Sequence, residues 1–310
     1  MPLAGGTITR SHIPSEMEEG LNKVIFRRYA LRNKQYEMLY NVETSKKRQE
    51  TQAMMAGAGT FQPKAEGNPP FIDSMEEAYT KQFIHDTWAL AMVVTHEARQ
   101  DDLYGPLQRM ADELGDSAGY TQSVDALDFL NDPTGLTLYT AEGTNFPLLS
   151  AAHFLKTGNT WSNRFAVPTT LDIVSLESGL NSYRTNMVDQ RGRKVSVNPK
   201  YLVVGVDNQM VATRLLGSQF RPGGDANDVN AARELYPDLE PLVLDHLTQN
   251  GAWFLWAAPA NHEFVYWDRE GFNTKMETPG DGSRNLLHAG FYRSSHGGAT
   301  PTGAFGSPGS

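Results

Sequence analysis

The sequence predicts an α+β protein in which a projecting β-hairpin and one long helix come before a compact domain of mixed helices and strands. The hairpin is indicated by strand-like residues on both sides of a segment rich in glycine and proline, residues 56–70. The long helix is indicated by apolar residues that keep helical spacing through residues 101–130. The chain has 310 residues, of which 39% are hydrophobic, enough for one large or two modest domains with their own cores.

The N-terminal segment predicts an arm followed by a helix. Residues 1–14 carry no regular pattern, and Ser15 and Glu18 then have the spacing of a capping box. We expect this helix to run to about Tyr40. Its apolar residues recur at helical spacing: Met17, Leu21, Val24 and Leu31.

Residues 43–96 predict a hairpin with little core of its own. The polar stretch 43–55 can form one strand, and the aromatic and β-branched residues of 79–96 form another. The glycines of 56–70 and the pair Pro69-Pro70 exclude a regular element between them. A two-stranded ribbon is marginal in water, so we expect this one to lie on another surface.

The predicted long helix spans residues 101–130. The residues that keep a helical period are Leu107, Met110, Leu114, Ala118, Thr121 and Leu127. Gly115 and Gly119 each weaken the helix by ~1 kcal/mol relative to alanine, which makes them hinge candidates. The sequence Asn131-Asp132-Pro133 ends it.

The C-terminal half predicts a compact α+β domain. We expect one helix capped by Thr170 and a second that is capped by Asp207 and reaches about Leu216. Strand-like runs occupy residues 194–197, 201–206, 242–247, 252–257 and 263–267. The Gly-, Ser- and Pro-rich residues 294–310 are assigned no structure.

Composition excludes several classes of protein. The absence of cysteine rules out disulfide scaffolds, thiolate nucleophiles and zinc sites with cysteine ligands. The net charge of −9 argues against a protein whose task is to hold nucleic acid, because that affinity comes mainly from phosphate neutralisation. No run approaches the ~20 apolar residues that cross a bilayer, and the N-terminus lacks a signal-peptide pattern, so we expect a cytoplasmic origin and no membrane.

One catalytic pattern is present. Residues 115–119 read Gly-Asp-Ser-Ala-Gly, which resembles the nucleophile elbow of lipase-like esterases around Ser117. The elbow needs a hydrophobic strand just before the serine, whereas the preceding residues here are charged and helical in spacing. His296-Gly297-Gly298 echoes the oxyanion-hole motif but lies downstream of the serine instead of upstream. A serine hydrolase based on Ser117 stays as an alternative to a small-residue patch where the helix bends or meets another backbone.

No further motif assembles a site. Residues 225–230 begin like a calcium loop, but valine holds the fifth position and no glycine the sixth, so we expect an Asx turn. Gly57-Ala58-Gly59 lacks the third glycine of a dinucleotide loop, and the eight histidines are scattered. We therefore predict no catalytic, cofactor-binding or metal-binding residue and no cofactor.

The order of several segments resembles that of tailed-bacteriophage major capsid proteins. The glycine-rich tip and residues 79–105 resemble their extended loop and following long helix. Residues 138–163 hold Glu142-Gly143, His153 and Ser162-Asn163 where the family has a DG…H…SN pattern. Residues 176–230 resemble its helix, strand pair and "P-G…N-D-x-N" turn, and residues 247–255 its late strand. The resemblance covers roughly residues 36–260 and rests on this order, since no single motif suffices.

This resemblance implies the Hong Kong 97-like fold and a division of the chain into five parts. The expected parts are an N-terminal arm and first helix (1–42), an extended loop (43–78), a peripheral domain with spine helix 101–130 (79–167), a mainly axial domain (168–293) and a flexible tail (294–310).

The function that the resemblance implies is structural and not enzymatic. The chain would form pentamers and hexamers of an icosahedral phage head around double-stranded DNA, touching the DNA only non-specifically. Its implied partners are a separate scaffolding protein, because few residues precede the first helix, a portal protein and, as a further candidate, a decoration protein. Its implied location is the virion, after assembly in the host bacterial cytoplasm.

Contacts between subunits are expected at the loop tip, where the candidates are Phe61, Lys64, Glu66, Asn68 and Phe71. Lys64 is also the lysine placed for an isopeptide bond of the kind known in some relatives. Gly115 and Gly119 are the hinge candidates of a shell that changes shape. A non-capsid oligomeric binding protein is the remaining alternative.

Overall fold

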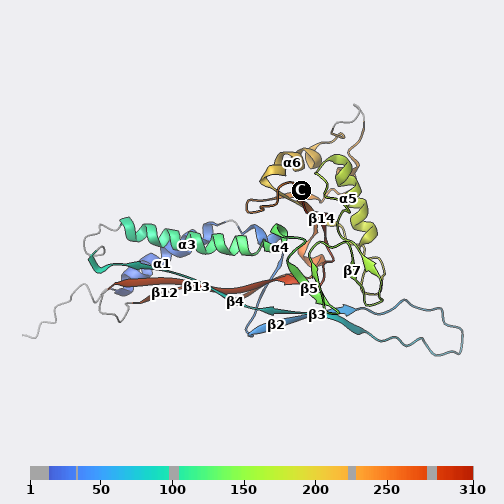
Figure 1. Cartoon of the computed structure of the whole chain (residues 1–310), viewed down its shortest axis with the longest axis horizontal. Coiled ribbons are helices and arrows are strands. Elements are labelled where there is room, and N and C mark those ends of the chain that lie inside the picture. Colours follow the sequence, from blue (N-terminus) through green and yellow to red (C-terminus); the bar gives the residue numbers. More distant parts are fainter. Residues whose placement is uncertain (1–13, 33, 98–104, 223–227, 278–284, 310) are drawn as a thin grey trace, which may run out of the picture. The chain divides into compact units, whose positions relative to one another are not determined.

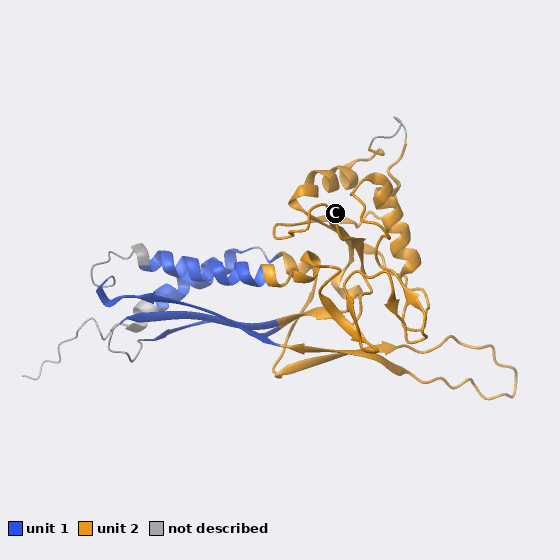
Figure 2. Ribbon diagram, viewed as in Figure 1, with its two compact units in different colours: residues 1–34, 85–123, 268–294 blue, residues 35–84, 124–267, 295–310 orange. Residues whose placement is uncertain are grey.

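The computed structural model describes residues 14–32, 34–97, 105–222, 228–277 and 285–309. Helices and strands are mixed along the chain, which confirms the predicted α+β class (Figure 1). The chain forms two compact units, each drawn from three separate stretches (Figure 2).

Unit 1 is drawn from residues 1–34, 85–123 and 268–294. Its elements are α1 (Pro14–Leu31), most of α3 (Gly105–Asp125), β4 (Asp86–Val94) and the adjoining parts of β12 (Phe264–Glu277) and β13 (Leu286–Gly298). Strand β13 runs antiparallel to β4, from Leu286 opposite Val94 to Ser294 opposite Asp86. A small core joins the helices to the strands: Ile25, Ala111, Leu114, Met92 and Phe272.

Unit 2 is drawn from residues 35–84, 124–267 and 295–310 and contains a four-stranded sheet of order β10–β9–β11–β14. The strands are β9 (Pro199–Gly205), β10 (Glu240–Leu244), β11 (Trp253–Ala257) and β14 (Ala304–Ser307). Strand β10 is parallel to β9, and the other two pairs are antiparallel. The sheet strands β9, β10 and β11, and the start of β12, confirm the strands predicted from residue 201 to residue 267.

Both faces of this sheet are buried, which explains why the sequence of β11 is apolar without a break. Trp253 and Leu255 face a core shared with the helices of unit 2, whereas Phe254 and Trp256 face a core shared with its hairpins. The elements around the sheet are α4 (Asp128–Asn131), β5 (Thr137–Ala141), β6 (Thr144–Pro147), β7 (His153–Phe154), β8 (Thr160–Trp161), α5 (Ile173–Asn186), α6 (Gln209–Gly217) and α7 (Ala231–Leu235).

The first helix is shorter than predicted. Helix α1 ends at Leu31 instead of near Tyr40, and a 3₁₀ helix, η2 (Gln35–Met38), follows before β1 (Asn41–Thr44). Ile25 belongs to the core of unit 1, whereas Tyr36 and Leu39 are buried in unit 2. The apolar spacing therefore continues past Leu31, but it serves two different cores and the helix does not continue with it.

The long helix and the strand after the loop tip are interrupted for the same reason. Helix α3 ends at Asp125, and α4 follows as a separate turn because Ala126 and Leu127 are buried in the core of unit 2. The beginning of the prediction, residues 101–104, lies outside the described residues. The predicted strand 79–96 is divided between β3 (Glu76–Ile84) in unit 2 and β4 in unit 1.

Two helix caps differ from the prediction. Asp172, not Thr170, caps α5, and its carboxylate accepts a hydrogen bond from the backbone N–H of Ser175 at 2.6 Å. Helix α6 follows the 3₁₀ turn η3 (Val206–Asn208) and has no side-chain cap. Asp207 lies inside that turn, so its carboxylate accepts the backbone N–H of Gly251 instead, at 2.7 Å.

The predictions for two C-terminal segments are wrong. Residues 194–197 form only an isolated bridge, from Lys194 to Val188. The predicted flexible tail, 294–310, is ordered over its described residues 294–309, because they contain the end of β13 and strand β14, and Phe305 is only 1% exposed. A Cβ on Gly306 would lie 2.6 Å from the carbonyl oxygen of Trp253, so this strand is rich in small residues because large neighbours leave no room.

Candidate assembly surface

Strand β2 (Gln49–Ala56) and strand β3 form the predicted hairpin. They run antiparallel from Gln49 opposite Ile84 to Ala56 opposite Glu76, with a bulge after Met54. Side chains alternate between a buried face, which includes Met54, and an exposed face, which includes Ile84. The ribbon thus packs against the rest of unit 2 by one face only. Its loop, residues 57–75, projects from the end where Ala56 pairs with Glu76 (Figure 1).

An arginine that is distant in sequence but also belongs to unit 2 contacts the base of the loop. Arg191 forms an ion pair with Asp73 at 3.1 Å and donates a hydrogen bond to the carbonyl oxygen of Ser74 at 2.7 Å. Asp73 also accepts the backbone N–H of Gly59 on the opposite side of the loop. This backbone bond, ahead of Arg191, lowers the pKa of the Asp73 carboxyl. We call these contacts the loop latch.

The turn that carries Arg191 is itself ordered by one carboxylate. Asp189 accepts the backbone N–H groups of Arg191 and Arg193, each at 2.9 Å, and pairs with the Arg193 side chain at 2.7 Å. Gly192 completes the turn with a φ of 77°, which a residue with a side chain rarely adopts. Arg191 is therefore presented to the loop from a fixed backbone.

Beyond the latch the loop is exposed throughout. Phe61 is fully exposed, and Phe71 and Ile72 are 70% and 89% exposed. At the tip, the backbone N–H of Asn68 bonds to the carbonyl oxygen of Ala65, a turn that Gly67 permits. The structure thus brings the five predicted contact residues together on one projecting loop: Phe61, Lys64, Glu66, Asn68 and Phe71.

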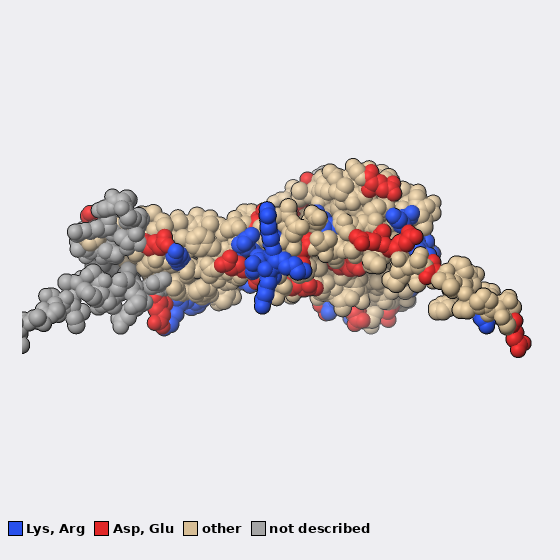
Figure 3. All heavy atoms as spheres, turned by 90° about the horizontal axis from the view of Figure 1, so that it is seen from below, with Lys and Arg blue, Asp and Glu red and all other residues tan. Residues whose placement is uncertain are grey.

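The opposite end of the ribbon carries a basic turn, residues 45–48, that the sequence reasoning missed. The buried hydroxyl of Ser45 donates to the Glu50 carboxylate at 2.8 Å, and the other Glu50 oxygen pairs with Lys47 at 3.0 Å. Lys46 and Arg48 are exposed on the same turn. Figure 3 shows Lys and Arg side chains gathered where this turn lies. The available signal was three consecutive basic residues in a chain of net charge −9.

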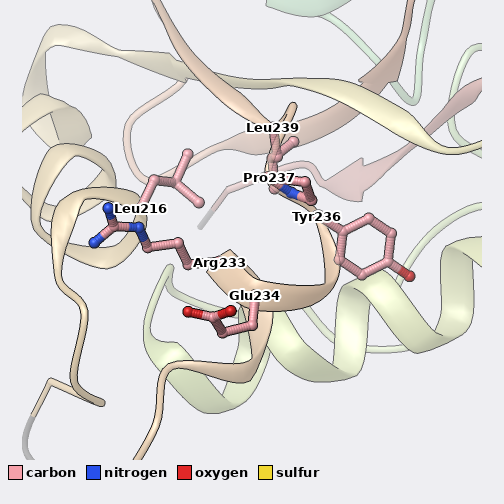
Figure 4. A pocket seen from close by; sticks show the side chains of 6 residues that line it. All are labelled: Leu216, Arg233, Glu234, Tyr236, Pro237 and Leu239. Atoms are coloured by element: carbon pink, nitrogen blue, oxygen red, sulfur yellow. The ribbon is translucent and has the colours of Figure 1, made fainter.

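A hollow of about 410 Å³ lies between α6, α7 and the start of β10 (Figure 4). Its lining is formed by Leu216, Arg233, Glu234, Tyr236, Pro237 and Leu239. Arg233 donates to the carbonyl oxygen of Gly217 at 2.9 Å, so its guanidinium is engaged in holding α6 to α7. The lining contains no nucleophile beside a base, and among the described residues no cluster of His, Asp and Glu could hold a metal.

A family described as phage capsid protein matches residues 78–303, well over half of the chain. The chain belongs to the phage capsid protein family. It is a structural subunit of the virion shell and not an enzyme, as the order of its segments predicted. No curated protein matches the sequence.

Solved structures confirm the Hong Kong 97-like fold for this capsid protein. The capsid structure of the cyanophage P-SCSP1u matches with a TM-score of 0.58 at 11% identity, over 87% of this chain and 86% of that one. A structure of Mycobacterium phage Patience matches with a TM-score of 0.57 at 12% identity, over 97% and 89%. A virus-like particle from Pyrococcus furiosus matches with a TM-score of 0.53 at 8% identity, over 94% and 99%.

Two residues of the segment that resembles the capsid DG…H…SN pattern, His153 and Asn163, belong to a buried polar network in unit 2, whereas Glu142 and Gly143 are exposed. The amide of Asn163 accepts from His153 and from the Ser150 backbone at 2.9 Å each, and donates to the carbonyl oxygens of Leu148 at 2.8 Å and Ala304 at 3.2 Å. All four bonds available to an asparagine amide are made, so this side chain joins the stretch 148–153 to β14. Burial lowers the pKa of His153 to about 4, although its bond to Asn163 acts in the opposite direction.

The Gly-Asp-Ser-Ala-Gly pattern of this capsid protein lies inside α3. Ser117 therefore has helix on both sides and lacks the strand–turn–helix geometry of a nucleophile elbow. A Cβ on Gly115 would collide with the carbonyl oxygen of Ile25, and one on Gly119 would lie 2.8 Å from the Arg32 side chain. The glycines allow α1 to approach α3 closely, which confirms the small-residue patch and leaves nothing to support the hydrolase.

Other motif predictions have mixed outcomes. The supposed Asx turn at 225–230 lies partly outside the described residues, but Asn230 is described and fully buried. Its side chain caps α7 and donates to the carbonyl oxygen of Leu215 at 2.6 Å. No helix in the described part of the chain is long and apolar enough to cross a membrane.

Proposed function

We propose that copies of this chain form the pentamers and hexamers of a closed icosahedral shell around double-stranded DNA, and that the loop 57–75 is a principal contact between them. The observation that carries the proposal is the loop itself. It exposes Phe61, Phe71 and Ile72, and the hydrogen bonds and ion pair that tie it to distant residues of the described chain are those of the latch at its base. Large side chains held out in this way mark an interaction site.

The energetics favour assembly through many such contacts. Covering one of these side chains contributes ~1.5–3 kcal/mol, before the cost of ordering the loop and of association is subtracted. One loop gives weak binding between two free subunits. In a closed ring or shell later contacts become nearly intramolecular, so weak contacts add to a stable particle. Lys64, Glu66 and Asn68 would supply the polar rim of the same contact.

The remaining parts of the proposal concern partners and organisation. A separate scaffolding protein, a portal protein and a decoration protein would meet the shell, which would assemble in the host bacterial cytoplasm and touch packaged DNA non-specifically. Membership of the phage capsid protein family supports these roles, because the shells of this family enclose a genome. Within the chain, the arm (1–42), the extended loop (43–78), the peripheral domain (79–167) and the axial domain (168–293) would divide the work of assembly.

We propose in addition that α3 changes its curvature near Gly115 and Gly119 when the shell changes shape. Two glycines one turn apart lower the stiffness of the helix at that point. The close contact between Gly115 and Ile25 restricts the test, because alanine at this position cannot simply stiffen α3. Comparing the curvature of α3 in precursor and mature particles is the direct measurement.

The loop contact is tested with the variant Phe61→Ser/Phe71→Ser/Ile72→Ser. These side chains are exposed in the subunit, so its circular dichroism and unfolding midpoint should stay unchanged while sedimentation shows that particles are lost. The matched control, Thr60→Ala/Gln62→Ala, alters the same loop without removing large apolar groups and should assemble. Normal particles from the triple variant would contradict the proposal.

A further inference from the structure

The β2–β3 ribbon has opposite charges at its two ends. The basic turn holds three consecutive cations, Lys46, Lys47 and Arg48. The other end, residues 57–77, contains one lysine against four carboxylates.

Several of these charges are already engaged within the subunit. Lys47 pairs with Glu50, and Asp73 pairs with Arg191. The charges that remain are Lys46 and Arg48 at the turn, and Glu66, Glu76 and Glu77 against the single cation Lys64 at the loop. All six are exposed, and the described part of the chain shows no hydrogen bond or ion pair for any of their side chains.

The two ends cannot meet within one chain. Arg48 comes just before Gln49, at one end of the ribbon, whereas Glu76 lies opposite Ala56 at the other end. The eight residues of β2 between them span about 26 Å, several times the screening length of about 8 Å at physiological salt. Glu66 lies farther out still, on the loop that projects away from the turn (Figure 1).

We infer that the basic turn of one subunit binds the carboxylates of the loop on a second copy of this chain. The inference rests on the proposed function and adds the receptor for the loop. Complementary charge at opposite ends of one rigid ribbon produces a head-to-tail contact, and head-to-tail contacts generate rings when the rotation closes. The apolar tip would supply most of the affinity, and the charges would select the register and reject wrong pairings.

The electrostatic half of the contact is tested by exchanging the charges. The turn variant is Lys46→Glu/Arg48→Glu, which leaves the Lys47–Glu50 pair in place. The loop variant is Glu66→Lys/Glu76→Lys/Glu77→Lys. We expect each variant alone to raise the protein concentration needed for particles about tenfold, since like charges then face each other. The two variants combined in one chain should return to within about twofold of the wild type.

The matched control for the turn variant also reverses two charges, elsewhere on unit 2. Lys194→Glu/Arg214→Glu changes two exposed cations away from the turn and should assemble like the wild type. Normal assembly of either the turn or the loop variant overturns the inference, and so does a combined variant that shows no recovery. A turn variant that assembles normally but retains less DNA would assign the turn to the nucleic acid instead.

Contact between the two ends is tested separately by crosslinking. Because the chain has no cysteine, Arg48→Cys combined with Glu66→Cys or Glu76→Cys introduces one unique pair. A short bismaleimide should join subunits of such particles into a ladder, and Arg214→Cys with the same partners should give none. Particles without a ladder from either pair overturn the inference but leave the proposed function intact. Absence of particles from the wild-type chain, even when it is expressed together with its scaffolding protein, would refute the proposed function itself.

Discussion

Two segments rich in glycine and proline, residues 56–70 and 294–310, have similar compositions and opposite environments. Phe61 in the first is fully exposed, whereas Phe305 in the second is buried between β11 and the helices of unit 2. A Cβ added to Gly67 would meet nothing within 4 Å, whereas one on Gly306 would strike the backbone of Trp253. Gly67 therefore lies where no other residue packs, whereas Gly306 lies where a neighbouring strand leaves no room for a side chain.

The difference shows where each segment finds its partners. Strand β14 has its partners inside its own unit, so its small residues are fixed by the shape of Trp253 and Phe254. The loop has almost none there, and its large side chains fit a partner outside the subunit. The residues of a capsid protein are thus constrained in two ways. Some must pack within their own chain, and others must bind neighbouring chains.

The largest expected effect separates the two phenylalanines. Phe305→Ala should lower the free energy of unfolding by ~3–5 kcal/mol, because it leaves a cavity against β11. Phe61→Ala should change it by less than ~0.5 kcal/mol, because nothing in the subunit covers the ring. Chemical denaturation of the soluble subunit measures both, and similar losses for the two variants would contradict the comparison.

The sequence predicts what depends on local pattern. The strands β9 and β11 were predictable because burial on both faces gives them nearly unbroken apolar runs, and the loop was predictable from its glycines and prolines. The end of α1 was not, because the apolar spacing continues while the chain passes from one core to another.

Contacts between distant residues were also hidden. Arg191 lies 118 positions from Asp73, so no local sequence pattern near either residue predicts the loop latch. The sequence of strand β14 resembles a flexible tail because it is rich in small residues. These residues are small because Trp253, about fifty positions earlier in the chain, packs closely against them. Only the fold brings these partners together.

The second prediction is a pH dependence that arises at His153, whose partner Asn163 donates a hydrogen bond to Ala304 in the buried segment. The folded pKa of His153 is about 4, below its ordinary value of 6.5, so the folded protein keeps the imidazole neutral while the unfolded chain takes up a proton. The stabilisation is complete above about pH 6.5 and is lost as the pH falls toward 4, by up to ~3 kcal/mol. NMR titration of His153 gives the pKa directly, and a native value near 6.5 would contradict this account.

The matched variant is His153→Gln, which keeps a donor for Asn163. Its stability should depend less steeply on pH between 6.5 and 4 than that of the wild type, although it starts lower at pH 7. Burial also lowers the pKa of His262 to about 4, so some acid sensitivity should remain in the variant.

The third prediction applies the same comparison to two helical glycines. Gly115→Ala should destabilise unit 1 by ~1–3 kcal/mol, because the new methyl group collides with the backbone of α1. Gly20→Ala, in α1, should stabilise the protein by up to ~1 kcal/mol, because nothing lies within 4 Å of the added carbon and alanine favours the helix. Thermal unfolding of the two variants should therefore shift in opposite directions, and shifts of the same sign would show that the contact with Ile25 does not decide the effect.

The smallest expected effect concerns the loop latch, where the segment with few partners meets its own subunit. Arg191→Ala removes the ion pair to Asp73 and the hydrogen bond to Ser74. Both groups of the ion pair are partly exposed, and no buried side chain loses its partner, so the unfolding midpoint should not move measurably. The amide of Gly59, which donates to Asp73, should nevertheless exchange hydrogen several-fold faster, since the base of the loop is no longer tied to the 189–193 turn. Lys194→Ala, on the same side of that turn but without a contact to the loop, should leave exchange unchanged. If exchange in the loop is equally slow in both variants, Asp73 and Gly59 hold the base by themselves, and the fixed direction of the loop comes from the β2–β3 ribbon alone.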